Sequence, residues 1–119
     1  MVAEVAMSIS EGENMRRVGF QFKINKEKIE EYKQHHQYVW PEMLQALRDS
    51  GWHNYSLFMR EDGLVFGYFE TEESLSAAQA KMTERDVNTR WQAFMSPFTD
   101  ESTRPDENFL ELEEYFHLD

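Results

Sequence analysis

Cysteine is absent from the 119-residue sequence. A chain without cysteine cannot build a disulfide framework, a thiolate zinc site or a cysteine nucleophile. Its stability must therefore come from packing. The material for packing is present, since 40% of the residues are hydrophobic and 14% are aromatic.

Positive charge is scarce, with 12 Lys and Arg against 23 Asp and Glu and a net charge of −11. Proteins that bind nucleic acids use Lys and Arg to displace counterions from phosphates. We therefore expect neither nucleic acid nor an acidic membrane surface as a partner. A neutral small molecule such as a sugar is compatible with this negative net charge. An acidic surface, however, more often serves to keep a protein soluble.

A basic leader and a long apolar run are missing from residues 1–14, which carry Glu4, Glu11 and Glu13. This stretch resembles neither a signal peptide nor a membrane span. We interpret residues 1–14 as a flexible N-terminal extension and predict a cytoplasmic protein. Residues 15–119 have the length of a single domain with one core and one site.

Strands and helices are predicted from the spacing of apolar residues. Alternation over residues 18–24 predicts a strand, and Asn25 is suited to cap the helix that follows. Pro41 disfavours helical geometry at Trp40, so we expect two helical segments joined there. The apolar positions of these segments are Ile29, Tyr32, His36, Trp40, Met43, Leu44 and Leu47.

The second half of the chain repeats the strand and helix patterns. Residues 54–70 predict a β-hairpin that turns at Glu61-Asp62-Gly63, and Thr71 is predicted to cap a second helix. A third helical stripe runs from Val87 to Phe98, and alternation over residues 110–118 predicts a final strand.

The resulting order, β-α-β-β-α-β, predicts an α+β, ferredoxin-like sandwich with its helices on one face of an antiparallel sheet. The other face would leave more apolar area in water than monomers usually expose. We therefore expect a homodimer of the dimeric α/β-barrel type, to which the strand of residues 109–118 contributes.

Two side chains on the first helical stripe could exchange protons. Tyr32 and His36 are four residues apart, on the face that points toward the sheet. An imidazole titrates near neutral pH and a phenol donates hydrogen bonds, which suits proton transfer on a neutral polyol. The alternative is an interior histidine and tyrosine with a packing role only. His35 points about 100° away and is expected to be solvated.

Aromatic residues could form the wall of a sugar site. Trp40 and Trp91 offer flat faces for the C–H side of a sugar ring, and Tyr55 adds a hydroxyl group. Ordinary core packing is the alternative for each. His53 begins the second strand and is ambiguous, and His117 is expected at an edge or interface. No metal-ligand spacing, glycine-rich phosphate loop or Gly-x-Ser-x-Gly motif occurs, so we expect no metal and no cofactor.

Four short motifs occur in the order found in one known family. They are Tyr32-x3-His36-x3-Trp40-Pro41-Glu42, Gly51-Trp52-His53-Asn54-Tyr55, Asp86-Val87-Asn88-Thr89-Arg90-Trp91 and Arg104-Pro105-Asp106. Together they resemble the L-rhamnose mutarotase family over residues 16–118. The family has Asn where Arg104 stands.

This resemblance implies an isomerase of carbohydrate metabolism that interconverts the α and β anomers of L-rhamnose or a related 6-deoxy sugar. It implies that His36 is the general acid/base and that Tyr32, Tyr55 and Trp91 contact the sugar. The family is dimeric and metal-free, and its reaction requires no cofactor. The family commonly has a second Trp where this chain has Gln92, which bears on sugar preference.

Two other functions remain open on the sequence. A cofactorless monooxygenase-like enzyme on the same fold would bind an aromatic or quinone substrate in the same pocket, and ligand polarity would separate the two. A non-catalytic sugar-binding dimer is the other alternative, which acceleration of anomer exchange would dismiss.

Overall fold

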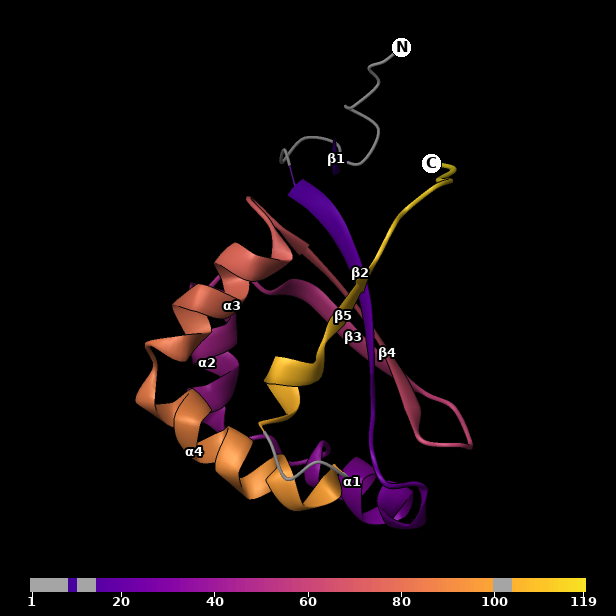
Figure 1. The fold of residues 1–119 in the computed structure, drawn as a ribbon. Coiled ribbons are helices and arrows are strands. Elements are labelled where there is room, and N and C mark those ends of the chain that lie inside the picture. The colour runs from indigo at the N-terminus through magenta and orange to yellow at the C-terminus, as the bar shows by residue number, and fades with distance from the viewer. Residues whose placement is uncertain (1–8, 11–14, 100–103) are drawn as a thin grey trace.

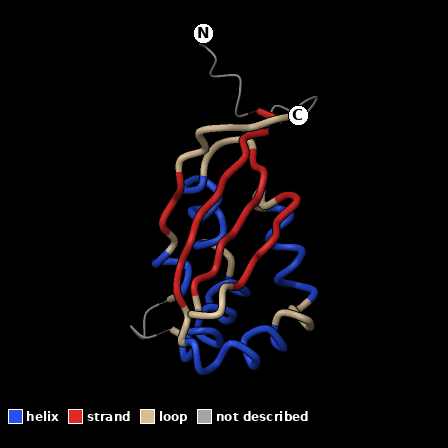
Figure 2. The backbone as a smooth tube through the Cα atoms, turned by 90° about the vertical axis from the view of Figure 1, so that its right-hand side faces the viewer, coloured by secondary structure: helices blue, strands red, loops and turns tan. Residues whose placement is uncertain are grey.

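The computed structural model describes residues 9–10, 15–99 and 104–119. Its regular elements are β1 (Ile9–Ser10), β2 (Met15–Lys23), α1 (Ile29–His35), α2 (Pro41–Asp49), β3 (His53–Met59), β4 (Leu64–Thr71), α3 (Leu75–Thr83), α4 (Asp86–Met95) and β5 (Leu110–Leu112). Short 3₁₀ helices are formed by Lys26–Lys28, Ser96–Phe98 and Pro105–Asn108. The helices lie on one side of the sheet (Figures 1 and 2).

The sheet is antiparallel, and its strands follow the order β3-β4-β2-β5. The long central pairing runs from Arg16 opposite Thr71 to Lys23 opposite Leu64. This strand order, with helices on one face, confirms the predicted ferredoxin-like α+β fold. β1 pairs with the start of β2, and the rest of the predicted N-terminal extension lies outside the described residues.

The pleat of β2 places Val18, Phe20 and Phe22 in the core, as the alternation predicts. Phe20 is completely buried and stacks on Phe109 at a centroid distance of 4.2 Å. Gly67 lies directly opposite Phe20 on β4, where a methyl group would overlap the Phe20 ring. The missing side chain of Gly67 therefore makes room for the centre of the core.

The first helical region is divided as predicted. The side chain of Asn25 accepts a hydrogen bond from the Glu27 N–H and caps the first 3₁₀ turn. α1 ends at His35, and α2 begins at Pro41. Proline is tolerated in the first turn of a helix because an N–H group there has no acceptor within the helix. The loop between them carries His36, which follows the last residue of α1 directly.

Two predicted boundaries are wrong. Thr71 is the last residue of β4, and the hydroxyl of Ser74 caps α3 by accepting from the Ala77 N–H. Thr71 stays in the sheet because it pairs with Arg16. The final strand ends at Leu112 instead of residue 118. It could not reach residue 118 on this edge, because β1 already pairs there with Met15 and Arg16.

A separate finding concerns membranes. Within the described part of the chain, no helix is both long enough and apolar enough to cross a bilayer.

Candidate active site

A cavity of about 350 Å³ lies between the helices and the inner face of the sheet. Its volume is within the range of about 300–1,000 Å³ that is typical of small-molecule pockets. Most of its wall is aliphatic or aromatic. Seven polar side chains also line it: Tyr32, His36, Tyr55, Gln79, Asn88, Gln92 and Asp106.

His36 reaches the cavity beside Tyr32, with 4.5 Å between the two ring centroids. Its Nδ1 atom lies 3.0 Å from the backbone carbonyl oxygen of Tyr32. A carbonyl oxygen only accepts hydrogen bonds, so Nδ1 carries a hydrogen and donates it. The Nε2 atom is therefore the nitrogen that can exchange a proton with a ligand.

The surroundings of His36 favour its neutral form. Burial lowers the pKa of His36 below its ordinary value of 6.5, and the nearby His35 lowers it further. The hydrogen bond to the Tyr32 carbonyl opposes this shift without cancelling it. At neutral pH most His36 rings are therefore uncharged, and Nε2 is able to accept a proton.

Tyr32 and Tyr55 present hydroxyl groups to the same cavity. Burial raises the pKa of both phenols, and Tyr32 and Asp106 add to the shift of Tyr55. Both phenols therefore keep their hydrogens at neutral pH. Among the described residues neither hydroxyl has a hydrogen-bond partner, yet no fully buried side-chain polar atom lacks one. Both residues line the cavity, so a ligand there can accept the hydrogen of each hydroxyl.

Trp91 forms a buried part of the wall, and its ring lies edge-on to His36 at 5.6 Å. Trp40 is not among the residues that line the cavity in the described part of the chain. It packs perpendicular to Trp91 at 5.0 Å, and it also contacts Phe94. The structure thus brings five of the six predicted site residues to the cavity and places Trp40 behind Trp91.

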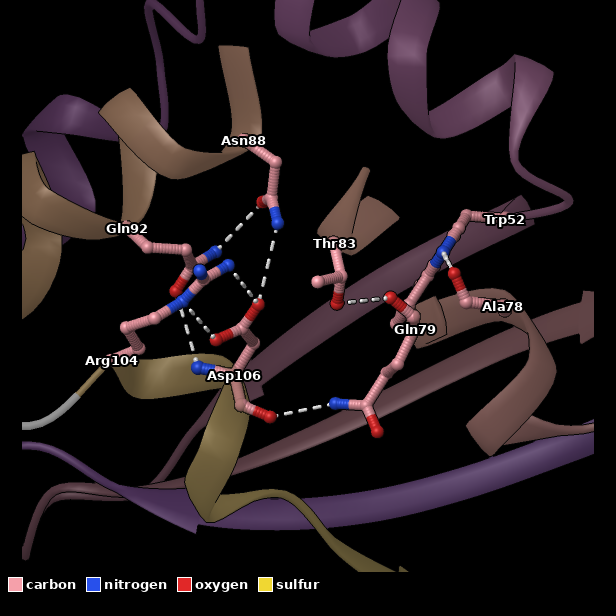
Figure 3. Close-up of polar contacts among 8 residues, drawn as sticks. All are labelled: Trp52, Ala78, Gln79, Thr83, Asn88, Gln92, Arg104 and Asp106. Carbon is pink, nitrogen blue, oxygen red and sulfur yellow. Dashed lines mark hydrogen bonds and ion pairs between the residues drawn. The ribbon is translucent and has the colours of Figure 1, made fainter. Parts of the chain in front are cut away.

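Gln92 is buried, and its side-chain amide is bonded in two directions (Figure 3). Its Nε2 donates to the Asn88 side-chain oxygen at 3.1 Å. Its Oε1 accepts the backbone N–H of Asp106, also at 3.1 Å. Gln92 therefore joins α4 to the segment that precedes β5.

Three polar residues of the wall were not predicted: Gln79, Asn88 and Asp106. Asn88 could have been found, because it lies on the inward stripe of α4 four residues before Gln92. Polar side chains at buried helical positions need hydrogen-bond partners inside the protein. Asp106 gives no comparable signal, since only the tertiary fold brings its loop to α3 and α4.

The other histidines lie away from the cavity wall. His35 is half-buried instead of solvated as predicted, because its ring packs against Phe94 at 4.8 Å. Each of the three is near an acidic side chain: His35 near Glu31, His53 near Glu72 and His117 near Asp119. Among residues 9–10, 15–99 and 104–119, no three His, Asp or Glu side chains gather as metal ligands.

Comparisons with known proteins identify the family of this chain. A family model described as L-rhamnose mutarotase matches residues 17–118. The L-rhamnose mutarotase of Oceanobacillus iheyensis is 35% identical over 88% of this chain and all of the relative, and that of Bacillus subtilis is 37% identical over 81% and 91%. The crystal structure of an L-rhamnose mutarotase from Formosa agariphila has a TM-score of 0.71 and 28% identity, covering 87% of this chain and 99% of that one. The family model covers residues 17–118 and the relatives match over most of the chain, so the chain belongs to the L-rhamnose mutarotase family.

Proposed function

We propose that this protein is an isomerase that interconverts the α and β anomers of L-rhamnose or a related 6-deoxy sugar, with His36 as its general acid/base. The observation that carries the proposal is the imidazole of His36, which has Nδ1 bonded to a backbone carbonyl and Nε2 available to the cavity. The relatives are named L-rhamnose mutarotases, which supports the choice of sugar.

The reaction moves protons and opens one bond. As Nε2 of His36 takes the hydrogen of the anomeric hydroxyl, the bond from the anomeric carbon to the ring oxygen breaks. The ring oxygen receives a proton through a tyrosine or water relay, and an open-chain aldehyde results. Rotation of the aldehyde and ring closure by the reverse transfers give either anomer. General acid/base catalysis contributes about 10²–10⁴-fold, which is adequate for a reaction that already proceeds in water.

The remaining wall residues are proposed to orient the sugar. The hydroxyls of Tyr32 and Tyr55 donate hydrogen bonds to sugar oxygens, because both phenols stay protonated at neutral pH. The indole of Trp91 supports the C–H face of the ring, with Trp40 packed behind it. Gln92 is proposed to influence which sugar is accepted.

Saturation-transfer NMR on L-rhamnose, L-fucose and a set of D-sugars tests the proposal, because it measures anomer exchange with and without the protein. We expect faster exchange for at least one 6-deoxy sugar. Binding without faster exchange of any sugar would contradict the proposal and favour a non-catalytic sugar-binding dimer. The comparisons favour neither that alternative nor the monooxygenase-like one.

The sheet face opposite the helices supports a homodimer as part of the proposal. Phe58 and Leu110 are about 60% exposed there, at 63% and 59%, and Phe66 and Leu112 add to the same surface. The register aligns Phe58 with Phe66 on β4, and Gln21 of β2 lies between Phe66 and Leu110. Apolar side chains thus lie on both sides of Gln21 on this face, and a second copy would remove them from water.

A cytoplasmic location also belongs to the proposal. The chain has no cysteine and so makes no use of an oxidising compartment. Fractionation of cells that express the protein would test the location.

A further inference from the structure

We propose that Asp106 is a further sugar-binding group, whose carboxylate accepts a hydrogen bond from a hydroxyl of the bound monosaccharide. Arg104, Asn88 and Gln92 are positioning residues that hold this carboxylate in the cavity wall. The inference rests on the proposed function, since it names a further contact of the same substrate.

The backbone of Asp106 is fixed from two helices (Figure 3). Its N–H donates to Oε1 of Gln92 on α4, and its carbonyl oxygen accepts from Nε2 of Gln79 on α3 at 2.7 Å. The residue follows Pro105 in the first turn of the 3₁₀ helix Pro105–Asn108. Asp106 therefore cannot turn away from the cavity without breaking contacts with both helices.

Among the described residues, three hydrogen-bond donors reach the carboxylate of Asp106. Nε of Arg104 donates to Oδ1 at 3.2 Å, Nη2 of Arg104 donates to Oδ2 at 3.1 Å, and Nδ2 of Asn88 reaches Oδ2 at 3.4 Å. A carboxylate can accept about four hydrogen bonds. One acceptor position, on Oδ1, is left. The side chain is 16% exposed and lines the cavity, so a ligand can fill that position.

The described wall holds few acceptors for sugar hydroxyls, and those apart from Asp106 are neutral side chains. Tyr32 and Tyr55 are donors, so a sugar hydroxyl that accepts from them must give its own hydrogen to another group. The side-chain oxygens of Asn88 and Gln92 already accept from protein donors. Among the described residues that line the cavity, Asp106 is the only carboxylate. Hydrogen bonds to a charged acceptor are stronger than neutral ones, which makes Asp106 the preferred acceptor.

The variant Asp106→Asn tests the inference, because it keeps the size of the side chain and both backbone contacts. Loss of a charge-assisted hydrogen bond is expected to raise the KM for L-rhamnose about 10-fold or more, with a smaller change in kcat. Arg104→Ala should raise KM by a smaller factor. Arg104→Lys should raise KM less than Arg104→Ala, because lysine keeps the positive charge although it cannot make the bidentate contact.

The chain offers a matched control in the turn between β3 and β4. Arg60 and Asp62 have the same two-residue spacing and the same two-pronged contact, with distances of 3.0 and 2.7 Å. Neither residue lines the cavity. Arg60→Ala and Asp62→Asn should therefore leave both KM and kcat unchanged.

Deoxy sugars separate a contact with the sugar from a merely structural role. For the wild-type protein, we expect the removal of one hydroxyl, at position 2, 3 or 4 of L-rhamnose, to lower the affinity more than removal of the others. For Asp106→Asn, removal of that same hydroxyl should lower the affinity less. A structural role alone would lower the melting temperature and leave the ranking of the analogues intact. That result would overturn the inference.

The remaining outcomes are also decisive. A folded Asp106→Asn protein with an unchanged KM would mean that the carboxylate serves only the adjoining outer cavity, which Arg104 and Glu107 also line, and the inference would be wrong. If Asp106→Asn does not fold, Arg104→Ala takes its place, and an unchanged KM in that variant overturns the inference. A wild-type protein that accelerates no anomer exchange refutes the proposed function instead.

Discussion

The imidazole of His36 has one nitrogen bonded to the Tyr32 carbonyl and one that faces the cavity. Replacing His36 by Ala removes the only imidazole in the described cavity wall and leaves two phenols whose pKa is raised. We expect His36→Ala to lower the catalysed anomer exchange about 10²–10⁴-fold with the fold intact. Saturation-transfer NMR gives the rate, and a thermal melt checks folding.

His35→Ala is the matched control, because His35 lies outside the cavity wall and packs on Phe94. Its exchange rate at neutral pH should stay near that of the wild type. Near-wild-type exchange in a folded His36→Ala protein would return His36 to the role of a packed core histidine.

The lowered pKa of His36 predicts the pH dependence of the enzyme. Proton abstraction needs the neutral ring, and a pKa below 6.5 keeps the ring neutral down to lower pH than in a free histidine. The kcat/KM should therefore be level near pH 7 and should fall only as the pH drops below 6.5. The measurement is the catalysed rate from pH 4.5 to 8 after subtraction of the uncatalysed rate. An acidic limb centred above pH 6.5 would be inconsistent with the buried site.

Gln92→Trp is expected to change the order of preference among 6-deoxy sugars. An indole would reshape one wall of the cavity, and it would also remove the acceptor for the Asp106 N–H. Exchange rates for L-rhamnose and L-fucose provide the test. Gln45→Trp is the control, since Gln45 is exposed on α2. Identical sugar profiles for the wild type and Gln92→Trp would show that this position does not set preference.

At the scale of the elements, the pairing of β2 with β4 depends on the absence of a side chain at Gly67. An added methyl group would overlap the ring of Phe20, which lies over Gly67 and stacks on Phe109. We expect Gly67→Ala to lower the free energy of unfolding by about 1–3 kcal/mol, as overpacked cores do. Gly19→Ala is the control on β2, because its nearest contact would be 4.0 Å away. Equal denaturation midpoints for the two variants would contradict this account.

Elements whose limits are set locally could be predicted from the sequence. The alternation of Val18, Phe20 and Phe22 fixes which side of β2 is buried, and Pro41 fixes the break between two helices. Elements whose limits depend on a distant partner could not. Thr71 remains in a strand because Arg16 pairs with it, and nothing near Thr71 in the sequence records that pairing.

The candidate site divides in the same way. Tyr32 and His36 could be proposed from the sequence because their spacing on one helical face is a local property. The contact from Gln92 to Asp106 joins residues that are 14 positions apart across a loop, so only the fold reveals it. Trp40 was predicted to contact the sugar because of its flat aromatic ring. In the structure it packs against Trp91, on the side away from the cavity.

At the scale of the whole molecule, the exposed sheet face predicts a dimer. We expect light scattering at micromolar concentration to give twice the mass of one chain. Phe58→Asp should shift the protein toward the monomer, because it places a charge on the apolar face, at a side chain that is 63% exposed. Tyr38→Asp is the control, since Tyr38 is 79% exposed in the loop before α2. A wild-type protein of monomeric mass would refute the prediction.

The cavity also has a consequence for how long the protein survives. Its wall and the hydrophobic core share residues such as Tyr32, Trp52 and Trp91, so the hollow lies inside the folded core. A sugar that fills it binds only the folded chain and lowers the unfolded population by mass action. Proteases degrade the unfolded population. The abundance of this protein in a cell should therefore rise with the supply of its own substrate through mass action alone.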